Sequence, residues 1–237
     1  MKYLRPNAQR AKNAITLIWI LMVLDIISLI SGYFQHDLLH TAANGGEISM
    51  ETANANDIRE RVIGIVYAVI YIITAVTFIQ WFRRAYFNLH QKVSHLRHNE
   101  GWAAGSWFVP IINLYRPYQI MRELYEETEE FLTEKRISFN PNFNTNYLGW
   151  WWTLWIISGI AGHVVLKLSL RAESIDELII ATDSSMISNI ISIPLALIAV
   201  KVIKDYSNVE PLLNEIKDEE ESTDAQQHLP ESGGSLV

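Results

Sequence analysis

The chain has 237 residues, of which 49% are hydrophobic and 19% are charged. Soluble domains average about 25% charged residues, and here the charges are concentrated in short segments between long apolar ones. Such separation is typical of a membrane protein, because a charge in hydrocarbon is costly. With no cysteine there is no disulfide or thiolate metal site, and no basic surface pattern predicts nucleic-acid binding.

Four apolar stretches are long enough to cross a bilayer, for which about 20 residues are needed. They are residues 14–34, 62–82, 147–168 and 179–203. The first is too long for the apolar region of a signal peptide, so we expect an uncleaved span. The fold prediction is therefore an all-α, polytopic membrane protein with four transmembrane helices.

The positions of lysine and arginine predict the orientation of these spans. Four basic residues precede the first span and eight lie in residues 83–146, whereas the connections 35–61 and 169–178 carry two and one. Because basic loops stay in the cytoplasm, we expect both termini and the segment 83–146 to be cytoplasmic. We expect a membrane domain over residues 1–205, and an acidic tail over residues 206–237 that is too poor in apolar residues to fold.

The segment between the second and third spans has two unusual parts. Residues 102–114 are apolar but too few to span, which predicts a re-entrant, interfacial or protein-buried segment. From Ile111, apolar residues recur every three or four positions through Leu114, Tyr118, Met121 and Tyr125, which predicts one face of an amphipathic helix. This helix would lie at the lipid headgroups or pack beneath the bundle.

Three motifs in this region are similar to those of a known family. They are WFRRAYFNL at 81–89, GWAAGSWFVPIINLYRPYQIMRELY at 101–125, and GWWW at 149–152. Over about residues 60–205 the chain resembles the bacterial DUF4328 family. The resemblance implies a multi-span protein of a bacterial plasma membrane, and it implies no activity, substrate or catalytic residue.

One carboxylate lies inside a predicted span. Asp25 is 11 residues beyond the start of the first stretch, a depth of about 16 Å at 1.5 Å per residue. Counting the same depth along the other spans predicts a polar layer of Asp25, Tyr71, Ser158 and Asn189. An intramembrane acid indicates a proton or cation relay, and the competing interpretation is a structural hydrogen-bonded cluster.

The second candidate site is an interface at the cytoplasmic boundary, where basic and aromatic residues gather. Its predicted members are Arg83, Arg84, Trp102, Trp107, Arg116, Arg122 and Glu123. Basic residues next to a span suit anionic lipid headgroups, and a cytoplasmic protein is the other partner considered.

No catalytic, metal-binding or cofactor-binding motif is recognisable, so we expect a non-enzymatic protein. Our first hypothesis is a scaffold or sensor that acts through the cytoplasmic segment. The alternative is a small transporter or channel that uses the Asp25 layer, which would require a homo-oligomer because four spans are few for a monomeric carrier.

Overall fold

The computed structural model describes residues 4–140 and 143–214, and all regular structure within these ranges is helical. Four long helices form the molecule: α1 (Ala8–Ala43), α2 (Met50–His90), α5 (Asn146–Ser169) and α6 (Ile175–Val209). Each contains one of the predicted apolar stretches and is long and apolar enough to cross a membrane. The predicted four-span, all-α fold is therefore confirmed.

The first two helices are longer than the apolar stretches, so the predicted connection 35–61 is mostly helical. Only residues 44–49 separate α1 from α2. Ser49 ends this short turn, because its Oγ accepts a hydrogen bond from the backbone N–H of Thr52 and caps α2. At the other hairpin, Ser174 and Glu177 form a capping box that starts α6.

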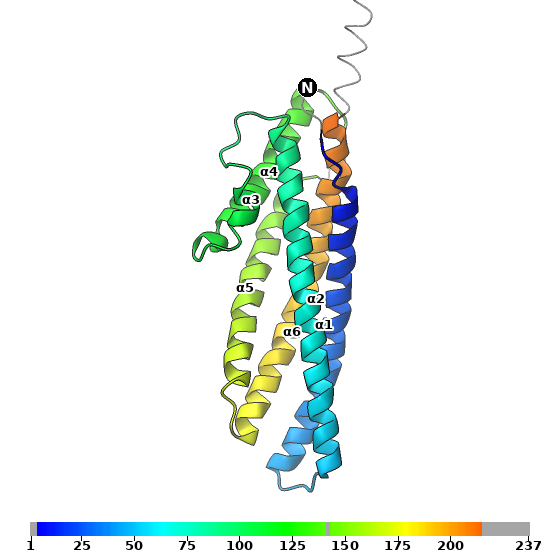
Figure 1. Cartoon of the computed structure of the whole chain (residues 1–237), viewed down its shortest axis with the longest axis vertical. Helices are drawn as coiled ribbons and strands as arrows, with labels where there is room; N and C mark the ends of the chain where they lie inside the picture. Colours follow the sequence, from blue (N-terminus) through cyan, green and yellow to red (C-terminus); the bar gives the residue numbers. More distant parts are fainter. Residues whose placement is uncertain (1–3, 141–142, 215–237) are drawn as a thin grey trace, which may run out of the picture.

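The helices run antiparallel in one bundle (Figure 1). Helix α1 packs against α2 and α6, and α6 packs in turn against α5. We call the end of the bundle that holds the start of α1 the terminal end. The opposite end, with the turns 44–49 and 170–174, is the hairpin end.

The protein core is concentrated at the terminal end. Its largest fully buried side chains include Trp81, Tyr86, Tyr125 and Tyr206. Along the middle of the bundle, by contrast, many isoleucines and valines of the spans are exposed. An exposed apolar belt of this extent is unfavourable in water and favourable against lipid chains.

Between α2 and α5 the chain forms α3 (Trp102–Gly105), the 3-10 helix η1 (Ile112–Leu114) and α4 (Arg116–Glu134). The predicted amphipathic helix starts later than expected, because Ile111 has φ of +67° and Arg116 is the first residue of α4. Ile111 and Leu114 therefore lie outside the helix. Met121 and Tyr125 are buried in the core, so α4 packs against the bundle rather than presenting this face to lipid.

The predicted boundary of the acidic tail is nine residues too early. Helix α6 continues to Val209, and a 3-10 helix, η2, covers Glu210–Asn214. Tyr206, Val209 and Leu213 are buried, and they supply the apolar contacts that order this part of the chain. The remainder of the predicted tail, 215–237, lies outside the described residues.

Candidate functional site

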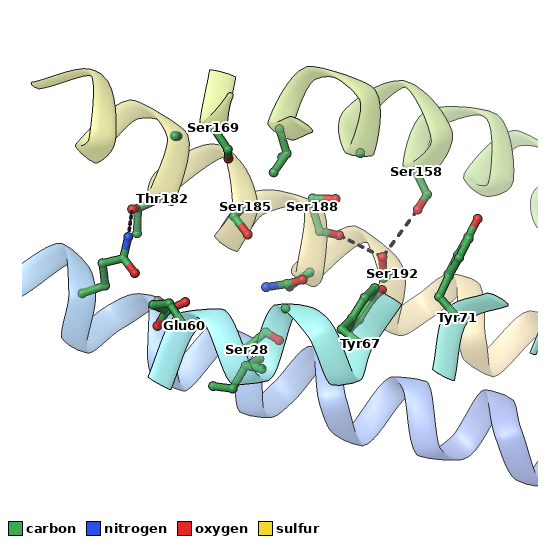
Figure 2. Close-up of a pocket in the computed structure, with 18 of the residues that line it drawn as sticks. Ser28, Glu60, Tyr67, Tyr71, Ser158, Ser169, Thr182, Ser185, Ser188 and Ser192 are labelled. Atoms are coloured by element: carbon green, nitrogen blue, oxygen red, sulfur yellow. Dashed lines mark hydrogen bonds between the residues drawn. The ribbon is translucent and has the colours of Figure 1, made fainter. Parts of the chain in front are cut away.

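A cavity of about 710 Å³ lies within the bundle, and all four long helices contribute to its wall. Most of its polar lining is hydroxyl groups, and Figure 2 shows them converging from α2, α5 and α6. The polar residues that line it are Ser28, Gln35, Glu60, Tyr67, Tyr71, Ser158, Ser169, Thr182, Ser185, Ser188, Asn189 and Ser192. Hydroxyl oxygens in a lipid-exposed bundle offer hydrogen-bond partners that hydrocarbon does not.

Asp25 lies beside this cavity. Its side chain is almost completely buried, and its Oδ1 accepts a hydrogen bond of 2.9 Å from the hydroxyl of Tyr67. Asp25 lines a second cavity, of about 340 Å³, towards the terminal end. Tyr67, Ser158 and Ser192 line both cavities, so the two adjoin at the level of Asp25.

Serine hydroxyls at this junction are already ordered by the helices. The hydroxyl of Ser192 donates to the backbone oxygen of Ser188 at 3.1 Å. Ser158 lies 3.4 Å from the same hydroxyl of Ser192, across the α5–α6 interface. Whichever of the two hydroxyls donates this bond, an acceptor lone pair of Ser158 remains for a solute.

Towards the hairpin end the cavity wall carries a second carboxylate. Glu60 of α2 accepts a hydrogen bond from Ser31 of α1. The guanidinium of Arg59 contacts Ser31 and donates to the side chain of Asn56 at 2.6 Å, and its separation from Glu60 is 3.5 Å. Glu60 therefore contacts both Ser31 of α1 and Arg59 of its own helix.

Two contacts hold α1 against α6 at the hairpin end. Gln35 donates to the hydroxyl of Thr182 at 3.0 Å, a bond that Figure 2 shows. His36 Nδ1 lies 2.7 Å from Asp183. The start of the predicted connection 35–61 is thus helical and contributes to an interhelical contact.

Aromatic rings close the terminal side of the second cavity. Trp107, which follows α3, lines this cavity and makes edge-to-face contacts with Phe78, Phe82, Trp152 and Trp155 at centroid distances of 5.5 to 6.4 Å. We call these five rings the aromatic wall. Three rings of the wall, Phe78, Trp107 and Trp155, line the second cavity.

The structure brings the predicted polar layer together only in part. Tyr71, Ser158 and Asn189 all line the larger cavity, and Asp25 lines the adjoining one. The partner of Asp25 is not Tyr71 but Tyr67, one helical turn closer to the hairpin end. The prediction placed α2 one turn out of register with α1, and on α6 it chose Asn189 instead of Ser192, which lies one turn closer to the terminal end.

Of the predicted interface residues, two are inside the molecule. Trp107 belongs to the aromatic wall. Glu123 is buried, and its carboxylate accepts hydrogen bonds of 2.6 Å from the Tyr86 hydroxyl and from the Arg97 backbone. Glu123 therefore fastens α4 and the preceding loop to α2.

The other predicted interface residues are more accessible. Arg83 and Trp102 are exposed, and Arg84 is partly exposed. Arg116 contacts the imidazole of His98, and Arg122 forms an ion pair with Glu126 on its own helix. These residues are spread over α2, α3 and α4 and do not form one surface with Glu123.

The polar groups that line the cavities indicate which classes of ligand could bind there. Across the two adjoining cavities, the carboxylates of Glu60 and Asp25 and several hydroxyls are suited to protons, small cations or small neutral polar molecules. Among the described residues, no group of three histidines or acids has the arrangement of a metal site.

Comparison with known proteins places the chain in a family. A family model described as a domain of unknown function, DUF4328, matches residues 44–208, which is more than two thirds of the chain. The match includes part of the first hairpin, which the sequence resemblance had not covered. No curated protein and no solved structure matches the chain. The chain therefore belongs to the DUF4328 family, a family of unknown function.

Proposed function

We propose that this protein is a small, non-enzymatic transporter or channel that passes protons or small cations through the cavity beside Asp25. The observation that carries the proposal is a hydroxyl-lined cavity that meets a buried carboxylate deep inside the bundle. Intramembrane acids that face a cavity are characteristic of ion and proton pathways. A bundle that served only as an anchor would gain nothing from a polar cavity among its spans.

We also propose that the terminal end faces the cytoplasm of a bacterium and the hairpin end faces outwards. The excess of lysine and arginine near the terminal end supports this orientation. In that orientation the larger cavity lies towards the outside, and the aromatic wall lies between Asp25 and the cytoplasm. The arrangement corresponds to an outward-facing state, in which ions reach Asp25 from outside.

The test is a flux assay with the full-length protein in liposomes, with a pH-sensitive dye inside and imposed proton, Na⁺ or K⁺ gradients. We expect wild-type vesicles to dissipate at least one gradient faster than protein-free vesicles. Asp25→Asn should abolish this flux, because the amide keeps the size of the side chain but cannot release a proton or carry a charge.

Asp37→Asn is the matched control, since Asp37 is an exposed acid on the same helix outside the cavity. Its flux should equal that of the wild type. Two results would overturn the proposal. One is that wild-type vesicles show no flux with any of the gradients, and the other is that Asp25→Asn and the wild type show equal flux.

One observation supports the scaffold or sensor hypothesis as a second candidate. Phe108 and Ile111, between α3 and η1, are 74% and 75% exposed, and Leu114 nearby is also exposed. This apolar loop, rather than the buried face of α4, would contact lipid or a partner protein. Replacing Phe108 and Ile111 with serine should then alter the proteins and lipids that co-purify with the chain, and an unchanged set would exclude this role.

A further inference from the structure

Four arginines gather at the terminal end, where α1 begins and α2 leaves its apolar stretch. Arg5 precedes α1 and Arg10 lies in its first turn, whereas Arg83 and Arg84 directly follow residue 82 of α2. The guanidinium of Arg10 donates to the backbone oxygen of Gln80 at 3.1 Å, and Gln80 lies one turn before Arg84. We call these four residues the arginine cluster.

The backbone of Arg5 is held in place on the same helix. Its N–H donates to the side-chain oxygen of Asn88, and the amide of Asn88 donates back to the Arg5 carbonyl, each at 2.9 Å. The Arg5 guanidinium lies over the ring of Phe87 at 4.4 Å. Arg5 is thereby fixed beside α2, 83 residues away in sequence from Asn88, so the cluster is built into the fold.

The positive charges of the cluster are not neutralised within the described part of the chain. None of the ion pairs between described residues includes Arg5, Arg10, Arg83 or Arg84. The pKa of Arg84 is lowered by partial burial and then by repulsion from Arg10, Arg5 and Arg83, and attraction to Glu210 is a smaller, opposing cause. The nearest counter-charge, Glu210, accepts hydrogen bonds from two asparagines rather than from an arginine.

We propose that the arginine cluster binds the phosphate of an anionic phospholipid in the adjacent leaflet. Guanidinium groups pair with phosphate oxygens through two parallel hydrogen bonds, and several arginines around one phosphate relieve their mutual repulsion. The cluster lies where the apolar stretches of α1 and α2 end, which is the level of lipid headgroups. The proposal is independent of any flux through the cavity.

A second anionic group is available in the chain itself. Residues 218–221, Asp-Glu-Glu-Glu, begin four residues after the end of η2. We favour the lipid because Arg83 and Arg84 directly follow the apolar stretch of α2 and Arg10 lies four residues before that of α1, which is the level of the lipid headgroups. Occupation by the acidic run is one outcome of the test below.

The test measures lipid retained on the full-length protein. Protein is reconstituted with phosphatidylglycerol and phosphatidylcholine in equal amounts, released into mild detergent and analysed by native mass spectrometry. We expect phosphatidylglycerol to be retained in preference to phosphatidylcholine, and Arg10→Gln/Arg84→Gln to lower this preference about fivefold for each arginine removed. Excess glycerol phosphate should compete weakly, because it lacks the acyl chains.

Arg171→Gln is the matched control, an exposed arginine at the hairpin end. Arg83→Gln, at an exposed position, tests the cluster if the double variant does not fold. Equal retention of the two lipids, or equal effects of Arg171→Gln and the cluster variants, would overturn the proposal. A third result would also overturn it: phosphatidylglycerol binds only when residues 218–221 are neutralised to Asn-Gln-Gln-Gln. That result would mean that the acidic run occupies the cluster in the wild type.

Discussion

The hydroxyl of Tyr67 on α2 donates a 2.9 Å hydrogen bond to the buried carboxylate of Asp25 on α1. A buried charged or polar group that lacks a partner costs free energy, so this bond stabilises the α1–α2 interface. The same pair lies where the two cavities adjoin. One contact therefore contributes to both the stability of the bundle and the properties of the proposed pathway.

Tyr67→Phe should lower the free energy of unfolding by about 1 kcal/mol, because hydrogen bonds between spans contribute on the order of 0.6 to 1.7 kcal/mol. Unfolding in mixed micelles with increasing denaturing detergent measures this change. Tyr71→Phe is the control. Tyr71 is exposed and lies one turn away, so the loss of its hydroxyl should leave the free energy of unfolding unchanged. Equal effects of the two variants would contradict the assigned partner of Asp25.

The membership of the polar layer shows what the sequence could and could not predict. Apolar length identified the four spans, because a bilayer imposes that length on any crossing helix. Depth counting assumed that all spans end at one level. The pair Asp25–Tyr67 shifts α2 by about one turn from that level, whereas Gln35–Thr182 and Asn7–Glu210 keep α1 and α6 at equal depth. Such pairs join residues 42 or more positions apart, and no local pattern reveals them.

Glu210 is predicted to fasten the two ends of the chain to α2. Its carboxylate is 6% exposed and accepts hydrogen bonds from Asn7 at 3.0 Å and Asn88 at 2.6 Å. Glu210→Ala would remove one acceptor from each amide, although Asn88 keeps the Arg5 carbonyl and Asn7 keeps the Trp81 carbonyl, at a cost of roughly 1–3 kcal/mol. Thermal unfolding in detergent should show a lower Tm for this variant.

Two variants separate the hydrogen bonds of Glu210 from general effects of charge. Glu210→Gln keeps one acceptor oxygen and should recover part of the lost stability. Glu130→Ala removes an exposed acid of α4 and should leave Tm unchanged. If Glu210→Ala matched Glu130→Ala, the cluster of Asn7, Asn88 and Glu210 would not contribute to stability.

His98 makes the terminal end sensitive to acid. Partial burial and then Arg116 act to lower its pKa, although Glu123 opposes them. The guanidinium of Arg116 lies 3.2 Å from Nδ1, which must be unprotonated to accept its hydrogen bond. Because the folded-state pKa lies below that of the unfolded chain, folding is favoured with neutral His98, and this contribution is lost as pH falls below about 6.5.

The measurement is the Tm of the wild type and of His98→Asn between pH 7.5 and about pH 5, the range in which an unperturbed histidine titrates. Asn offers Arg116 an acceptor that does not titrate in this range, so the wild type should lose more stability than the variant on acidification. His163→Asn removes an exposed histidine and should follow the wild-type profile. Parallel profiles for wild type and His98→Asn would refute the assignment.

Gly32 allows α1 and α6 to approach closely. A Cβ at this position would lie 3.0 Å from Cγ of Met186. Gly32→Val should therefore push the helices apart next to the Gln35–Thr182 bond and lower the free energy of unfolding by roughly 1–3 kcal/mol. Gly149→Ala, which meets open space, should cause no loss. A neutral Gly32→Val would show that Met186 moves aside freely.

The segment between α2 and α5 shows a second limit of sequence reasoning. Apolar residues at spacings of three and four indicated one helix from Ile111 to Tyr125, but Ile111 adopts a left-handed conformation and ends that pattern. Pro110 indicated a break in this segment, but a β-branched residue rarely has positive φ, so the sequence did not predict a turn at Ile111 itself. Trp107 was predicted at an interface, and its large ring instead fills the space between α2 and α5.

Trp107 provides the last prediction, because it is the centre of the aromatic wall. Trp107→Leu should keep an apolar side chain there but leave a gap between Phe78 and Trp155, so water would enter the smaller cavity from the terminal end. We expect faster flux in the liposome assay and some loss of stability. Trp102→Leu, on the exposed side of α3, is the control and should change neither. Unchanged or slower flux in Trp107→Leu would show that the wall does not limit passage, and the pathway would have to leave the bundle elsewhere.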